Sequence, residues 1–222
     1  MTGLDRIKNQ IEAVNPFARN RRRKMRRQLH NSDVTFLVPN CIGGILFHDL
    51  GLQFRSPTVN LMMTQTDFVR FVLNLKDYLA QELEFFKHSE YVCPCAHLAD
   101  VDVHFTHYDT EEAAAKKWHE RIDRINWDNL FVFCEERDGL TEQEMRALSA
   151  VPAKGIVVFT ANRYDGIPYA LQIAEYQQAG EVGNILKRSY WNDGREYEKY
   201  FDFVKWFNEA DGKNFDISPF IR

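Results

Sequence analysis

Runs of apolar residues alternate along this chain with segments of helical spacing. The clearest apolar runs lie at 34–38, 129–134 and 155–160. A run of this length, bounded by polar residues, is typical of a buried strand. Weaker strand patterns lie at 56–63, 91–108, 171–174 and 183–187. The predicted strands are therefore spread over most of the chain.

Apolar residues that recur three and four positions apart predict the helices. These segments lie at 45–50, 66–79, 111–125, 141–149 and 195–209. Thr141 and Glu144 have the spacing of a capping box at the start of one of them. Strands that are apolar throughout and alternate with helices are typical of parallel sheets covered on both faces. We therefore predict a three-layer α/β fold whose mixed, mainly parallel sheet gains an antiparallel pair from 91–108.

The charge distribution separates the N-terminal segment from the rest. Residues 1–30 contain nine Lys and Arg against Asp5 and Glu12, whereas the remaining residues contain 19 basic and 30 acidic side chains. An apolar stripe at Leu4, Ile7, Ile11 and Val14 precedes the arginines. We predict a basic amphipathic arm at 1–30, followed by a single α/β domain at 31–222.

The arm has three interpretations. It is either a solvated helix on the body, an anchor to an anionic membrane surface, or a nucleic-acid contact. The acidic body and the absence of interleaved aromatic residues argue against nucleic acid. No run of about 18 apolar residues and no secretion signal is present. We read the four cysteines as reduced, which predicts a cytoplasmic protein that is peripheral at the inner membrane face if the arm binds lipid.

In a parallel sheet, ligands bind outside the carboxyl ends of the strands. That rule places four loops at one edge, namely 40–44, 107–109, 135–139 and 160–165. The first of them joins a strand to a helix through Gly43-Gly44. Free N–H groups at a helix start bind anions, so this turn either holds a phosphate or simply permits close packing. Neither a Walker loop nor the dinucleotide-binding glycine pattern is present.

Cys41 lies in the same turn and is a candidate nucleophile, since a helix start lowers a thiol pKa. His48 is about two helical turns away, on the order of 10 Å, so His104 or His107 is the better base. The alternative is a small buried packing residue. Arg121 and Arg124 follow each other around one helix and either grip a diphosphate or pair with surface acids. Asp138 is of interest only for its position at the edge.

Two patterns suggest metal chemistry. Cys93, Cys95 and His97 alternate, so a strand would place them on one face, but the second ligand pair of a usual zinc site is missing. Asp100 and Asp102 match the D-x-D pattern of metal-dependent nucleotide-sugar transferases, a pair that this many aspartates produce by chance. We assign no metal ligands. The cofactor is left undetermined, with a divalent metal as one option.

Several blocks resemble a bacterial family, the domain of unknown function numbered 1919, which is often labelled exopolysaccharide biosynthesis protein. The blocks are 40–44, 48–52, 56–61, 104–108, 118–128 and 201–208. The resemblance covers roughly 25–210 and implies an α/β fold and a role in capsule or exopolysaccharide assembly. It implies no reaction, but it favours the candidate residues in its blocks: Asn40, Cys41, Gly43, Gly44, His48, Asp49, His107, Arg121 and Arg124.

The leading hypothesis is a transferase acting on a phosphate-bearing precursor of a surface polysaccharide, a nucleotide sugar or a lipid-linked glycan. Gly43 would hold the phosphates, His107 or Asp49 would be the base, and Arg121 and Arg124 would neutralise the leaving group. The second hypothesis is a hydrolase or acyltransferase with Cys41 as nucleophile and His107 as base. The third is a non-enzymatic module that recruits a polysaccharide synthase through its arm.

Overall fold

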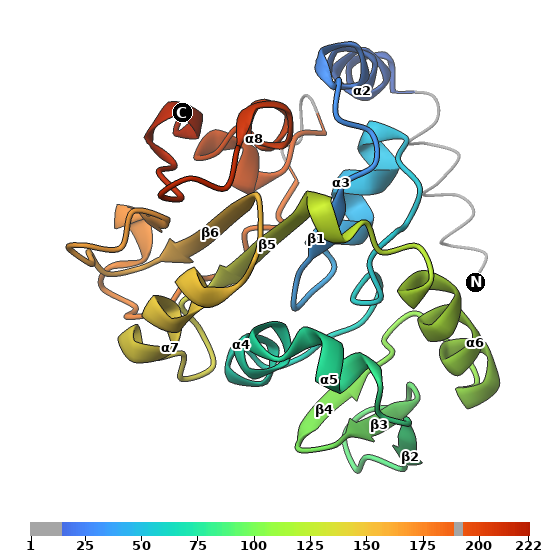
Figure 1. The fold of residues 1–222 in the computed structure, drawn as a ribbon. Helices are drawn as coiled ribbons and strands as arrows, with labels where there is room; N and C mark the ends of the chain where they lie inside the picture. The colour runs from blue at the N-terminus through green and yellow to red at the C-terminus, as the bar shows by residue number, and fades with distance from the viewer. Residues whose placement is uncertain (1–14, 189–192) are drawn as a thin grey trace.

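The computed structural model describes residues 15–188 and 193–222, and it contains a parallel sheet of four strands. Their order across the sheet is β1 (Thr35–Leu37), β5 (Leu130–Glu135), β6 (Gly155–Thr160) and β7 (Ala170–Gln172). All three pairings are parallel, and in the register Phe36 lies beside Phe131. The predicted α/β fold is confirmed, and Figure 1 shows the strands running through its centre.

One face of this sheet is covered by α3 (Ile42–Leu50) and α8 (Phe203–Glu209). Phe131 packs edge-on against Trp206 and Phe207, with ring centroids 4.8 and 5.1 Å apart. Phe36 makes the same kind of contact with Phe207, at 5.2 Å. Such edge-to-face pairs add stability beyond the burial of apolar area, which makes this aromatic layer the centre of the core.

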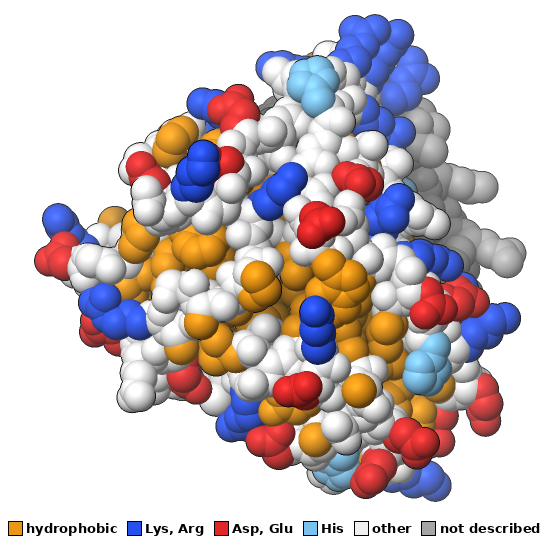
Figure 2. Space-filling model, viewed as in Figure 1, with side chains coloured by type: hydrophobic (Ala, Val, Ile, Leu, Met, Phe, Trp, Pro, Cys, Tyr) orange, Lys and Arg blue, Asp and Glu red, His pale blue; other side chains and the backbone are white. Residues whose placement is uncertain are grey.

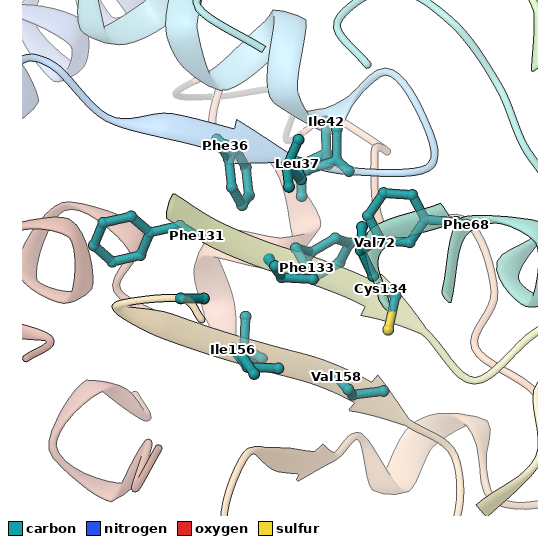
Figure 3. Packing of buried hydrophobic residues seen from close by; sticks show 14 of the residues in the cluster. Phe36, Leu37, Ile42, Phe68, Val72, Phe131, Phe133, Cys134, Ile156 and Val158 are labelled. Carbon is teal, nitrogen blue, oxygen red and sulfur yellow. The ribbon is translucent and has the colours of Figure 1, made fainter. Parts of the chain in front are cut away.

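The opposite face is covered by α4 (Gln65–Leu73) and α7 (Glu142–Ala147). Figure 3 shows Phe68 and Val72 of α4 beside Cys134 of β5. All residues of β5 and β6 are buried, as expected for strands with helices on both faces. The three-layer arrangement follows from this double coverage.

A second, antiparallel sheet lies beside the first. It consists of β2 (Glu84–Phe86), β3 (Cys95–Leu98) and β4 (Val101–His104), with α5 (Leu75–Leu79) and α6 (Glu111–Ile122) nearby in Figure 1. The antiparallel pair predicted within 91–108 therefore exists, but it belongs to a separate sheet. Strand β2 escaped prediction because only three residues form it.

Two of the weaker strand predictions are wrong. Residues 57–60 form a turn in which Asn60 has a φ of 65°, and only Met62 pairs, through an isolated bridge to His104. A left-handed residue breaks the extended backbone that a strand needs. Residues 183–187 form no strand, since their segment has only the bridge between Arg188 and Arg195.

Two long predicted helices are divided. Asn74, with φ −124° and ψ 38°, separates α4 from α5, so that 66–79 is not one helix. The predicted helix at 195–209 is divided into a 3-10 helix at Glu196–Lys199 and α8. Phe201 lies between the two and pairs with Ile221 through an isolated bridge, so its backbone is not helical. In both cases the apolar spacing continues across a residue whose backbone is not helical.

The described part of the arm is helix α2 (Pro16–Gln28), which packs against α3. Ala18 is fully buried, and Arg26 donates to the carbonyl oxygens of Asp49 and His48 at 2.8 and 3.0 Å. The apolar stripe predicted at 4–14 lies outside the described residues. Within the described residues, no helix combines the length and the apolar character needed to cross a bilayer. All four cysteines are free.

Candidate active site

The structure brings Cys41 and His107 together. The Cys41 Sγ lies 3.3 Å from the His107 Nε2, although the two residues are 66 positions apart. Cys41 is the N-cap of α3 and follows the edge strand β1, whereas His107 lies in the loop after β4. Both positions are accessible from solvent. The molecule also has a cavity of about 360 Å³ lined by residues between Lys187 and Arg222, and neither Cys41 nor His107 lines it.

The glycines after Cys41 lie inside α3 rather than in a turn before it. The helix begins at Ile42 instead of the predicted residue 45, so Gly43 and Gly44 belong to its first turn. A Cβ on Gly43 would lie 2.8 Å from Val38 Cγ2, and one on Gly44 would lie 2.4 Å from Asn60 Oδ1. Close packing therefore accounts for both glycines. That packing also fixes the position of Cys41 relative to the sheet.

Asn40 connects the start of α3 to a buried carboxyl group. Its Oδ1 accepts the N–H of Ile42 at 3.0 Å, and its Nδ2 donates to Glu135 Oε2 at 3.3 Å. Glu135 ends the central strand β5, where its own N–H donates to Gln65 Oε1 at 3.0 Å. The loops predicted to meet at 40–44, 107–109 and 135–139 thus supply Asn40, Cys41, His107 and Glu135.

Burial dominates the electrostatics of this site. It raises the pKa of the Cys41 thiol, so the lowering expected at a helix start is wrong; a hydrogen bond from Thr106 opposes the rise. Burial also raises the pKa of Glu135 to about 7, against the opposing influence of Arg137 and Asn40. At neutral pH the Cys41 thiol is therefore protonated at rest, and attack on a substrate requires a base such as His107.

We expect Glu135 to make the stability of the protein fall between pH 4.5 and about 7. In that window the folded state keeps the proton that the unfolded carboxyl, with its ordinary pKa of 4.5, has already released. The free energy of unfolding therefore decreases as the pH rises, and it levels off above pH 7. In Glu135→Gln this pH dependence is removed. The free energy of unfolding of the variant, relative to that of wild type, should therefore rise by about 2 to 3 kcal/mol from pH 5 to pH 8.

Denaturant unfolding of both proteins at pH 5 and pH 8 measures this difference. Glu82 is an exposed carboxylate without an ion pair among the described residues, and Glu82→Gln is the matched control. The control should leave the profile unchanged. Parallel stability profiles for wild type and Glu135→Gln would contradict the expectation.

The two candidate arginines have structural partners. Arg121 is buried, donates to the Val59 carbonyl at 2.6 Å, and lies over the rings of Phe54 and Tyr108. Arg124 donates to the Phe54 carbonyl at 3.4 Å and to Glu120 at 3.3 Å. These contacts hold α6 and the residues just after it against the loop at 54–59. The prediction that the pair grips a diphosphate gains no support from these contacts.

Among the described residues, three other candidates form no hydrogen bond or ion pair with Cys41, although Asp138 is close enough to raise the pKa of Glu135. His48 and Asp49 are at the carboxyl end of α3, so the helix separates them from its N-cap by about 10 to 12 Å. Asp49 is buried against Arg21 and Arg22 of α2, while the side chain of His48 is 71% exposed. Asp138 has a φ of 54° in the tight turn after β5.

The patterns that suggested metal ligands do not converge. Cys95 is buried with its Sγ 3.2 Å from His104 Nδ1, whereas His97, on the same face of the strand, is exposed and bonds Asp102 at 2.6 Å. Asp100 instead accepts from Tyr78, also at 2.6 Å. Across 15–188 and 193–222, no group of three His, Cys, Asp or Glu side chains has the geometry of a metal site.

Two further residues belong to the site: Glu135, which the sequence places at this edge without marking it as a candidate, and Thr106, which it does not indicate. A glutamate that directly ends a buried apolar run is a usable signal, because a carboxyl group at that position is desolvated by the strands around it. Thr106 had no comparable signal. Its contact with Cys41 depends on the separate antiparallel sheet, which carries the 104–108 loop to the edge of the parallel one.

Comparison with known proteins places this chain in a family. A family model described as a domain of unknown function, DUF1919, matches residues 13–208. An uncharacterized protein of Haemophilus influenzae is 38% identical over 210 residues, which cover 95% of this chain and 100% of that protein. Both matched regions span the positions of Cys41, His107 and Glu135 in this chain. The chain therefore belongs to the DUF1919 family.

Proposed function

We propose that this protein is a cysteine-dependent enzyme of acyl transfer, an acyltransferase or hydrolase. The observation that carries the proposal is the 3.3 Å contact between Cys41 Sγ and His107 Nε2 at the start of a helix. A nucleophile and a base within hydrogen-bond reach are the minimal apparatus for a covalent acyl intermediate. The partial positive charge at the N-terminus of α3 favours the thiolate that forms during attack.

The reaction has two steps. Cys41 Sγ bonds to the acyl carbon as its proton passes to His107 Nε2, and the bond to the leaving group breaks as His107 returns that proton to it. An acceptor hydroxyl or water then gives its proton to His107 and takes the acyl group, which restores the thiol. Burial keeps the resting thiol protonated, so each cycle begins with proton transfer to His107.

For the acceptor we propose a hydroxyl group of a surface-polysaccharide precursor. The support is the resemblance of blocks 40–44 and 104–108 to a family that carries the exopolysaccharide label, and these blocks hold both members of the pair. Attaching an acyl substituent to a glycan is a transferase reaction that this pair can perform. It joins the two leading hypotheses in one activity.

Sugar transfer from a nucleotide donor remains a separate prediction. Its support is the start of α3, where the N–H groups of Gly43 and Gly44 have no hydrogen-bond acceptor among the described residues and could bind a phosphate. The N–H of Ile42 already donates to Asn40. Arg121 and Arg124 bind backbone carbonyls instead. The non-enzymatic module also remains a prediction, and its signature is partner binding without turnover.

The experiment that tests the proposal is capture of an acyl-enzyme. The purified protein is incubated with p-nitrophenyl acetate or acetyl-CoA, quenched with acid, and analysed by intact mass and peptide mapping. We expect a mass increase of one acetyl group at Cys41 that disappears on addition of a polyol acceptor. Acetylation spread over Cys93 or surface lysines, with none at Cys41, would contradict the proposal.

A further inference from the structure

The outward face of α2 is a dense cationic surface. The helix contains seven Lys and Arg among 13 residues and no acidic residue. Figure 2 shows basic side chains gathered over this end of the molecule. A hollow of about 450 Å³ on it is lined by five arginines, Arg19, Arg22, Arg23, Arg26 and Arg27.

The basic residues of α2 fall into two sets. Arg21, Arg22 and Arg26 bind the body, where their partners are Asp49, Glu198, Asp193 and the last carbonyl groups of α3. Arg22 and Arg26 lie at the edge of the outward face and also line the hollow. The other four are exposed and form no ion pair with any described residue; these are Arg19, Arg23, Lys24 and Arg27. The inner set neutralises the acids beneath the helix, so no acid among the described residues offsets the charge of the outer set.

We propose that this outer face of α2 docks on an anionic lipid bilayer. Each Lys or Arg held near such a surface contributes about 1 kcal/mol of attraction, roughly a fivefold gain in partitioning. Phe17, at the start of the helix, is 69% exposed and lies beside the basic face. An exposed aromatic ring next to cationic side chains is typical of helices that lie in a membrane interface.

Charge elsewhere in the chain favours a membrane over a duplex. Residues 31–222 carry 19 basic and 30 acidic side chains, so a nucleic acid that extended past α2 would meet an acidic body. A bilayer touches only the protruding helix. Since α3 is nine residues long and Cys41 is its N-cap, about 13 Å of helix would separate the α2 contact from the reactive thiol.

The test is co-sedimentation of the full chain with vesicles of phosphatidylcholine, with and without phosphatidylglycerol. We expect binding to the anionic vesicles alone, weakening as salt is added. Neutralising the outer set should lower partitioning by about 10²- to 10³-fold, in the variant Arg19→Gln, Arg23→Gln, Lys24→Gln and Arg27→Gln. Phe17→Ala should lower it several-fold.

A matched control removes four exposed lysines from other elements, in the variant Lys87→Gln, Lys116→Gln, Lys154→Gln and Lys213→Gln. It should bind as wild type, and so should Cys41→Ser, since the surface does not depend on the acyl-transfer site. Equal binding to neutral vesicles, or equal loss in both fourfold variants, would overturn the proposal. Displacement from the vesicles by duplex DNA at the same charge concentration would assign the surface to nucleic acid instead.

Discussion

Replacing Cys41 with serine is expected to reduce acyl transfer by at least about 10³-fold, as loss of the nucleophile does in other covalent enzymes. A serine hydroxyl at this position keeps the size of the side chain but is far less acidic than the thiol, and His107 cannot activate it to the same degree. The measurement is the initial rate of p-nitrophenol release from p-nitrophenyl acetate, together with intact mass after quenching. Unfolding midpoints should match those of wild type.

His107→Gln separates catalysis from packing. We expect a loss of about 10²- to 10⁴-fold near pH 7, the usual contribution of a general base. Because burial raises the Cys41 thiol pKa, little thiolate exists at neutral pH without that base. More thiolate forms as the pH rises, so the difference between wild type and His107→Gln should shrink in alkaline solution. A merely structural histidine would not produce this convergence.

The matched control for the nucleophile is Cys93→Ser, in the segment before β3. It should acylate as wild type does. If Cys41→Ser keeps its activity, acyl transfer at this site is excluded, and the nucleotide-sugar and scaffold predictions become the better accounts. A thermal-shift screen with nucleotide sugars, with and without manganese, then distinguishes those two, since a ligand at 100 times its Kd raises stability by about 2.7 kcal/mol.

The parts of the fold that the sequence predicts are those where local pattern and burial agree. β5 and β6 are apolar throughout because helices cover both of their faces, and such runs admit few other interpretations. Prediction fails where one residue overrides its neighbours, as with the left-handed Asn60 and the non-helical Asn74. Hydrophobic spacing carries no information about these backbone angles, which tertiary contacts determine.

The candidate site shows the same division. The rule that ligands bind at the carboxyl ends of parallel strands places Cys41 and Glu135 at one edge from sequence alone. It cannot decide between His104 and His107, because that depends on where the antiparallel sheet lies. The structure buries His104 against Cys95 and presents His107 to Cys41. Arg121 is a case in which the sequence misleads. The sequence favours a role in binding a ligand, but in the structure its guanidinium holds α6 to the loop at Val59.

Asp49 is expected to be the most important single charge for the packing of α2 against α3. It is buried at the end of α3 and accepts a hydrogen bond from Arg21, while Arg22 lies 3.7 Å from its other oxygen. Removing one member of a buried ion pair costs about 3 kcal/mol or more when the other is left uncompensated. Arg21 keeps Glu198 and Arg22 keeps Asp193, which offset part of that cost. We therefore expect Asp49→Asn to lower the free energy of unfolding by about 2 kcal/mol, measured by denaturant titration.

A double-mutant cycle with Arg21→Gln isolates the pair, and amide hydrogen exchange locates the effect. If Asp49 stabilises the contact between the two helices, the double variant should lose less than the sum of the single losses, and exchange in Asp49→Asn should rise first along α2. Asp165→Asn, at the exposed pair with Arg163, is the control and should change stability by no more than about 0.5 kcal/mol. A loss that is additive, or exchange that rises evenly over the chain, would show that Asp49 does not act through α2.

Lipid binding adds a further readout. If Asp49→Asn releases α2 from α3, the helix keeps its basic side chains but no longer holds Cys41 in a fixed orientation to the membrane. Asp49→Asn should therefore still sediment with anionic vesicles.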